Sequence, residues 1–165
     1  MTPHIQAVTD DNVGDCFATC VACILDLPAG SVPNFKAAQE AGPNVCMVDL
    51  ADRWLRENHG LRFISVELYD PADGPNKGHP LTSQCLLNRL CHTNPGELVI
   101  LSGESPRRRA DGGRKYHCVV ATPSVWGFDI VHDPHPDGTG IVGQPYGVKW
   151  IVPLTIPATL DRRPE

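Results

Sequence analysis

Residues 14–28 read GDCFATCVACILDLP, and this stretch decides the fold. From Cys16 to Leu27 the residues are almost wholly apolar, which predicts a helix buried on nearly every side. Asp15 comes directly before this run, and we expect its carboxylate to cap the helix by accepting backbone amides of the first turn. Pro28 and Gly30 end the run. The stretch therefore predicts a buried N-terminal helix that begins with Cys16.

The rest of the chain predicts one more long helix and then mainly strands. An apolar stripe predicts a helix over residues 48–58, and a shorter helix is expected at 83–91. Residues 103–115, GESPRRRADGGRK, are expected to form a long basic loop. Strands are expected at 61–68, 97–103, 116–122, 128–132 and 148–154. Because the helices come first and the antiparallel strands later, the sequence predicts an α+β fold.

Length and charge narrow the class of protein. The 165 residues are expected to form a single domain over 1–165, with 158–165 as a flexible tail. The net charge of −5 gives no reason to expect a nucleic-acid partner, although PRRRADGGRK holds five of the 14 basic residues. We find no apolar stretch of membrane-spanning length and no signal-peptide pattern, so we expect a cytoplasmic protein without a membrane partner.

The three cysteines Cys16, Cys20 and Cys23 have three interpretations. Their spacing matches the pattern that holds an iron–sulfur cluster, but here it falls inside a helix. A zinc site could join them to His117, Cys118, His132 or His135, although paired ligand motifs are missing. We favour a third interpretation, without metal or cofactor, in which Cys20 and Cys23 pack in the core. Cys16 differs because the helix dipole and free amides at a helix start stabilise a thiolate.

A candidate base and its orienting acid lie about a hundred residues downstream, in KYHCVVATPSVWGFDIVHDPHP. His117 opens one expected strand and Asp133 closes the next. A hairpin that turns about Val125 would bring these two residues opposite each other. A shift of one residue would oppose His117 to His132 instead, and Asp129 is a weaker alternative acid. Cys16, His117 and Asp133 would then supply a thiol nucleophile, a general base and its orienter.

A family resemblance joins these segments. Its residues are Gln6, GDCFATCVACILDLP, VPNF, ADRWLRENHGL, HCVV and HDPHPDG, which span about residues 6–140. In this order they resemble the papain-like cysteine peptidase superfamily, closest to the bacteriocin-leader-processing (double-glycine) peptidases and small phage and bacterial proteins like them. The resemblance implies a buried N-terminal helix carrying Cys16, packed on a C-terminal antiparallel sheet. It also implies that Gln6 and the Cys16 amide stabilise the oxyanion.

The expected function is thiol hydrolysis of a peptide or isopeptide bond through an acyl-enzyme. The basic segment around Arg109 favours an acidic substrate, and His132 or His135 could contact the substrate or simply belong to a rigid loop. One alternative is a catalytically silent papain-like protein that binds a partner. Another is a zinc or iron–sulfur protein that uses Cys16, Cys20 and Cys23. An intact triad would favour the enzyme, whereas a buried or unpaired Cys16 would favour the binding protein.

Overall fold

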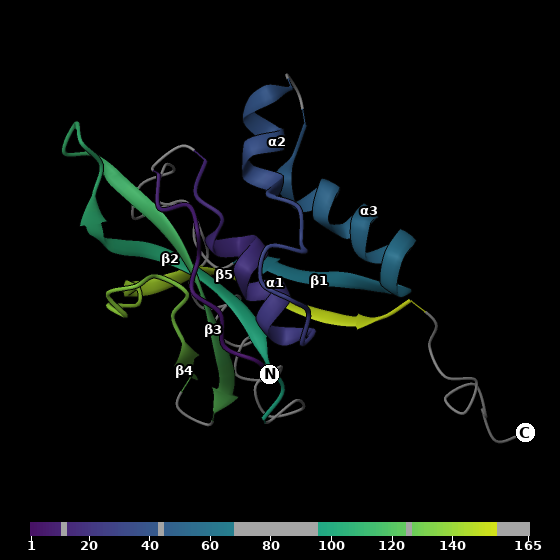
Figure 1. Ribbon diagram of the computed structural model, residues 1–165. Helices are drawn as coiled ribbons and strands as arrows, with labels where there is room; N and C mark the ends of the chain where they lie inside the picture. Colours follow the sequence, from purple (N-terminus) through teal and green to yellow (C-terminus); the bar gives the residue numbers. More distant parts are fainter. Residues whose placement is uncertain (11–12, 43–44, 68–95, 125–126, 155–165) are drawn as a thin grey trace, which may run out of the picture.

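The computed structural model describes residues 1–10, 13–42, 45–67, 96–124 and 127–154 (Figure 1). The expected helix at 83–91 and the expected tail at 158–165 lie outside these residues. The described helices are α1 (Cys16–Ile24), α2 (Phe35–Ala41) and α3 (Met47–His59). The described strands are β1 (Leu61–Glu67), β2 (Val99–Arg108), β3 (Arg114–Ser124), β4 (Gly127–His132) and β5 (Val142–Pro153). The α+β class is confirmed.

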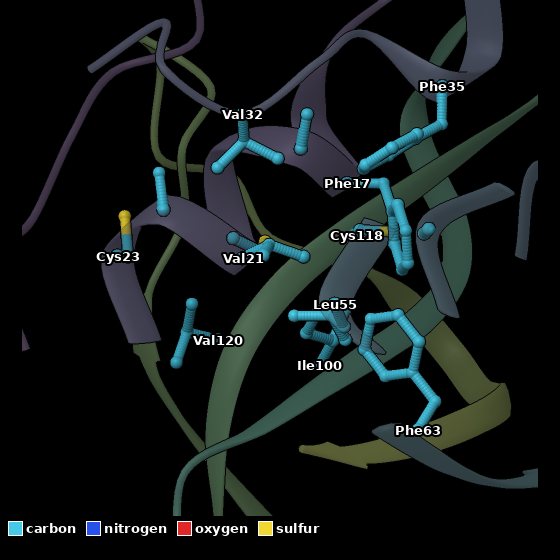
Figure 2. Packing of buried hydrophobic residues seen from close by; sticks show 14 residues of the cluster. Phe17, Val21, Cys23, Val32, Phe35, Leu55, Phe63, Ile100, Cys118 and Val120 are labelled. Carbon is cyan, nitrogen blue, oxygen red and sulfur yellow. The ribbon is translucent and has the colours of Figure 1, made fainter. Parts of the chain in front are cut away.

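The strands form one antiparallel sheet in the order β1-β5-β2-β3-β4. Helix α1 lies over β3 and β2 on the first face of this sheet, α3 packs next to β1, and α2 packs on α3 (Figure 1). The core of this face joins Phe17 of α1, Phe35 of α2 and Leu55 of α3 to strand residues that include Cys118 and Val120 (Figure 2). The second face carries a separate apolar cluster of Val99, Leu101, Val119, Ala121, Val148 and Trp150. Each face of the sheet therefore carries a separate apolar cluster.

Helix α1 begins at Cys16, as the sequence predicts, but its cap differs from the prediction. Asp15 occupies the N-cap position without a side-chain capping bond. Its carboxylate instead accepts the backbone amides of Ala7 at 3.2 Å and Val8 at 3.0 Å. The prediction that Asp15 caps the helix through its side chain is therefore wrong, because the N-terminal segment takes up the carboxylate.

The basic loop expected at 103–115 is largely a hairpin. Strand β2 continues to Arg108 and β3 starts at Arg114, so only the turn around Arg109 lies between them. In that turn, Arg109 N donates to Gly113 O at 3.0 Å. Glu104 accepts Arg108 at 2.9 Å and lies 3.7 Å from Arg114, which offsets the positive charge along the two strands. The loop prediction is wrong because local composition does not show this pairing.

Strands β3 and β4 pair next to each other as expected, but in a different register. Ser124 pairs with Gly127 and Ala121 with Ile130, after which an irregularity leads to Val120 opposite His132. A turn about Val125 would have paired His117 directly with Asp133, and this part of the prediction is wrong. Strand β4 ends at His132. His117 therefore lies beyond the part of β3 that pairs with β4.

Candidate functional site

His117 and Asp133 contact each other even though they are not a ladder pair. His117 Nε2 lies 2.6 Å from Asp133 Oδ1, and their side chains are only 4% and 6% exposed. Asp133 Oδ1 also accepts the amide of His135 at 2.8 Å, and Oδ2 accepts the amide of Gly140 at 2.6 Å. With one imidazole and two backbone donors, the carboxylate is fixed in position and fully engaged.

The segment after β4 brings Asp133 to His117. Ile141 packs on Gly103, which lies opposite His117 in the pairing of β2 with β3. A Cβ atom at Gly103 would stand 2.8 Å from Ile141 Cδ1 and 3.1 Å from Ile141 Cβ, so a larger residue would push Ile141 away. On the N-terminal side, Gln6 N donates to Pro134 O at 2.8 Å. The segment is thus held at both ends around His117.

The environment favours a neutral imidazole beside an ionised carboxylate. Burial lowers the pKa of His117, and the nearby Arg107 lowers it further, although Asp133 opposes this shift. Burial alone would raise the pKa of Asp133, but hydrogen bonds from His117, His135 and Gly140 outweigh it, so the pKa is lowered. A neutral ring that donates its Nε2 hydrogen to the carboxylate leaves Nδ1 as a proton acceptor. The pair therefore has the arrangement of a general base with its orienter.

Arg107, one of the five basic residues of PRRRADGGRK, is a neighbour of this pair. Its Nη1 lies 2.5 Å from Asp137 Oδ1, and its Nε donates to Ser105 Oγ at 2.9 Å. Its Nη2 atom is buried and has no hydrogen-bond partner among the described residues. Gly103, Ser105 and Arg107 are two residues apart along β2, and side chains with this spacing point to the same face of a sheet. This spacing is the signal in the sequence that Arg107 shares a face with Gly103.

The histidines and the arginine expected to contact substrate have separate surroundings. His135 packs its ring 6.1 Å from that of His117, and its Nδ1 lies 2.9 Å from Asp137 Oδ1. His132 Nε2 lies 2.7 Å from His4 O and so holds the N-terminal segment against the end of β4. Arg109 lies in the exposed hairpin turn, where it pairs with Asp111 at 3.3 Å. Only His135 directly borders His117.

Gln6, the expected oxyanion donor, is buried beside the same segment. Its Nε2 donates to Val8 O at 2.8 Å, and its Oε1 is buried without a hydrogen-bond partner among the described residues. Because Gln6 N also bonds Pro134 O, this residue connects the N-terminal segment to the Asp133 segment. One hydrogen of its amide group is taken by Val8, which leaves the other for a further acceptor.

Cys16 lies against the first face of the sheet and contacts Cys118. A hydrogen bond between the two thiols, together with burial, raises the pKa of Cys16 well above its usual value. His117 and Cys118 are consecutive on β3, so their side chains point to opposite faces. No hydrogen bond joins Cys16 to His117 in the described part of the chain. The structure thus brings His117 and Asp133 together and places the thiol of Cys16 with Cys118.

Cys20 and Cys23 are core residues, which confirms that part of the sequence analysis. Both side chains are fully buried, and Cys23 Sγ accepts His4 N at 3.3 Å. Within the described ranges, no three histidine, cysteine or acidic side chains are grouped as metal ligands would be. The described helices also include none that is long and apolar enough to cross a bilayer.

The chain was compared with models of protein families, with curated proteins and with solved structures. None of the three comparisons gives a match.

Proposed function

We propose that this protein is a papain-like thiol hydrolase that cleaves a peptide or isopeptide bond, with Cys16 as nucleophile, His117 as base and Asp133 as orienter. The observation that carries the proposal is the buried 2.6 Å contact between His117 and Asp133. A carboxylate held by three donors fixes the tautomer and the orientation of the imidazole. The first residue of a buried helix supplies the thiol.

The proposed mechanism starts from a neutral thiol and a neutral imidazole. The raised pKa of Cys16 and the lowered pKa of His117 both disfavour a resting thiolate–imidazolium pair. His117 Nδ1 would take the thiol proton as Cys16 Sγ attacks the carbonyl carbon, and Asp133 would stabilise the imidazolium. The imidazolium then protonates the leaving amine, and water releases the acyl group from the thioester. The Cys16 amide and the second amide hydrogen of Gln6 would stabilise the oxyanion.

This mechanism requires Cys16 Sγ to leave Cys118 and reach His117. We propose that the thiol passes around the outer edge of β3, where the pairing with β4 stops at Val120. Cys16 contacts Cys118, which lies in the part of β3 that does not pair with β4. Catalytic hydrogen bonds are often long or misaligned without substrate and tighten in the complex. An acidic substrate would pair with Arg107, whose charge acts on His117, rather than with Arg109 in the exposed hairpin turn.

The test uses transfer of an acetyl group from p-nitrophenyl acetate, followed by intact mass and peptide mapping. We expect a transient acetyl thioester on Cys16 near neutral pH. His117→Gln should slow its formation by about 10²–10⁴-fold, because the proton acceptor is lost. Cys46→Ser removes an exposed cysteine outside the site and should leave the rate unchanged. Equal rates in the parent protein and His117→Gln, or an acetyl group only on Cys118, would contradict the proposal.

The contact of Cys16 with Cys118 favours a second candidate, a silent papain-like protein that binds a partner. In that case His117 and Asp133 stabilise the segment after β4 and take no part in turnover. This candidate predicts no acetyl thioester on Cys16 in a protein that is folded by circular dichroism. The same experiment therefore separates the two candidates.

A further inference from the structure

Cys118 lies in a polar cluster on the first face of the sheet that the proposed hydrolysis does not use. Ser102 pairs with Cys118 across β2 and β3, and Ser102 Oγ lies 3.5 Å from Cys118 Sγ. The thiol of Cys16 reaches Cys118 from the start of α1. Lys149 of β5 is buried, and its Nζ lies 3.8 Å from Glu67 Oε1. The lysine points to the same face because it pairs with Ile100 of the α1 core.

These neighbours stabilise one negative charge shared by the two thiols. Hydrogen bonding from Cys16 and from Ser102, with the charge of Lys149, outweighs burial and lowers the pKa of Cys118 to about 7. The remaining proton is then held more tightly, and the pKa of Cys16 is raised. A coupled pair of thiols loses its first proton with a low apparent pKa and its second proton with a high apparent pKa. The charge is drawn toward Cys118 because Ser102 Oγ lies 3.5 Å from its sulfur and the positive charge of Lys149 acts on it.

We propose that Cys16 and Cys118 are a redox pair that closes to a reversible disulfide when a hydroperoxide oxidises the protein. The Cys118 thiolate attacks the peroxide oxygen and becomes a sulfenic acid, while the O–O bond breaks and releases water or an alcohol. Cys16 Sγ then attacks the Cys118 sulfur, an S–S bond forms, and the sulfenic oxygen leaves as water. Two thiols are oxidised by two electrons, and the peroxide is reduced.

Cys16 is the partner rather than Cys20, although both are on α1. Of these two cysteines, Cys16 forms the hydrogen bond with the Cys118 thiol, whereas Cys20 is fully buried in the core. Cys16 is half-buried, so this end of the cluster is open to a small oxidant. The disulfide would also block the proposed nucleophile. That consequence depends on the proposed function, but formation of the disulfide does not.

Peptide mapping tests the pair directly. The reduced protein is treated with equimolar hydrogen peroxide, free thiols are blocked with iodoacetamide, and the protein is digested with trypsin. Cys118 is the only cysteine in the tryptic peptide 116–149, and Cys16 lies in the peptide 1–36. We expect these peptides to be linked, and dithiothreitol should separate them. Oxidation of Cys118 to sulfinic acid with no link in the parent protein would overturn the proposal.

Matched serine variants assign the partner, because peptide 1–36 also contains Cys20 and Cys23. The link should persist in Cys20→Ser, Cys23→Ser and Cys46→Ser and disappear in Cys16→Ser. In Cys16→Ser the sulfenic acid on Cys118 should persist and react with dimedone. A link that survives Cys16→Ser would overturn the pairing. Lys149→Gln should slow closure near pH 7, by about fivefold if the pKa of Cys118 rises by one unit, because the thiolate fraction falls. An unchanged rate would contradict the role of the lysine.

Discussion

Two consecutive residues of β3, His117 and Cys118, serve two different regions of the molecule. On the second face, His117 is held by Asp133, whose carboxylate is fixed by three hydrogen bonds. On the first face, Cys118 lies in the apolar core under α1 and meets a second thiol. Because consecutive residues of a strand point to opposite faces, one strand keeps the polar pair apart from the thiol pair. The first region is held by buried hydrogen bonds, and the second combines apolar packing with the polar contacts of the Cys118 thiol.

The largest effect on the free energy of unfolding is expected when the polar region loses the Asp133 carboxylate. Asp133→Ala removes the partner of His117 and of two backbone amides and leaves these buried donors unsatisfied. We expect a loss of about 3–5 kcal/mol in the free energy of unfolding, measured by urea titration, because each buried donor without an acceptor costs about 1–3 kcal/mol. Asp111→Ala is the matched control in the exposed hairpin turn, and it should cost less than about 1 kcal/mol. Equal losses in the two variants would contradict a structural role for the buried pair.

Much of the fold could be predicted because apolar runs and helix-ending residues mark its elements locally in the sequence. The apolar run from Cys16 predicts α1, and Gly60, in the left-handed region at φ 64°, ends α3 as a C-cap glycine should. Helix α2 was missed, although Asn34 caps it by accepting Ala37 N at 3.1 Å. An Asn before an alanine-containing segment was the available signal.

The candidate site could be predicted only in part. The hairpin expected from the order of the segments predicts that His117 and Asp133 meet. The register irregularity at Val120 could not be predicted, because it depends on contacts between distant residues. The face of β3 that meets α1 could not be read from HCVVA, because all five residues are buried. A strand covered on both faces shows no alternation of polar and apolar residues. The contact of Cys16 with Cys118 therefore became visible only in three dimensions.

A smaller effect is expected in the thiol region. Cys20 is fully buried among apolar residues, so Cys20→Ser places a hydroxyl where no described side chain is bonded to the sulfur. We expect a loss of about 1–3 kcal/mol in the free energy of unfolding. Cys46→Ser, at an exposed position, should change it by less than about 0.5 kcal/mol. If Cys20→Ser were as stable as Cys46→Ser, packing at α1 would not depend on an apolar side chain there.

The smallest effect on the free energy of unfolding is expected from the titration of His117. The direction of this change with pH tests the surroundings of His117. Burial, followed by Arg107, lowers the pKa of His117 below 6.5 in the folded state. Between that lowered pKa and 6.5 the unfolded chain binds more protons than the folded protein, so stability should fall as the pH drops through this window. The lowered pKa of Asp133 adds a further loss only below 3.8. Urea titrations at about pH 7 and about pH 5 should show a smaller fall for His117→Gln than for the parent protein. Parallel falls in both proteins would mean that a group other than His117 titrates there.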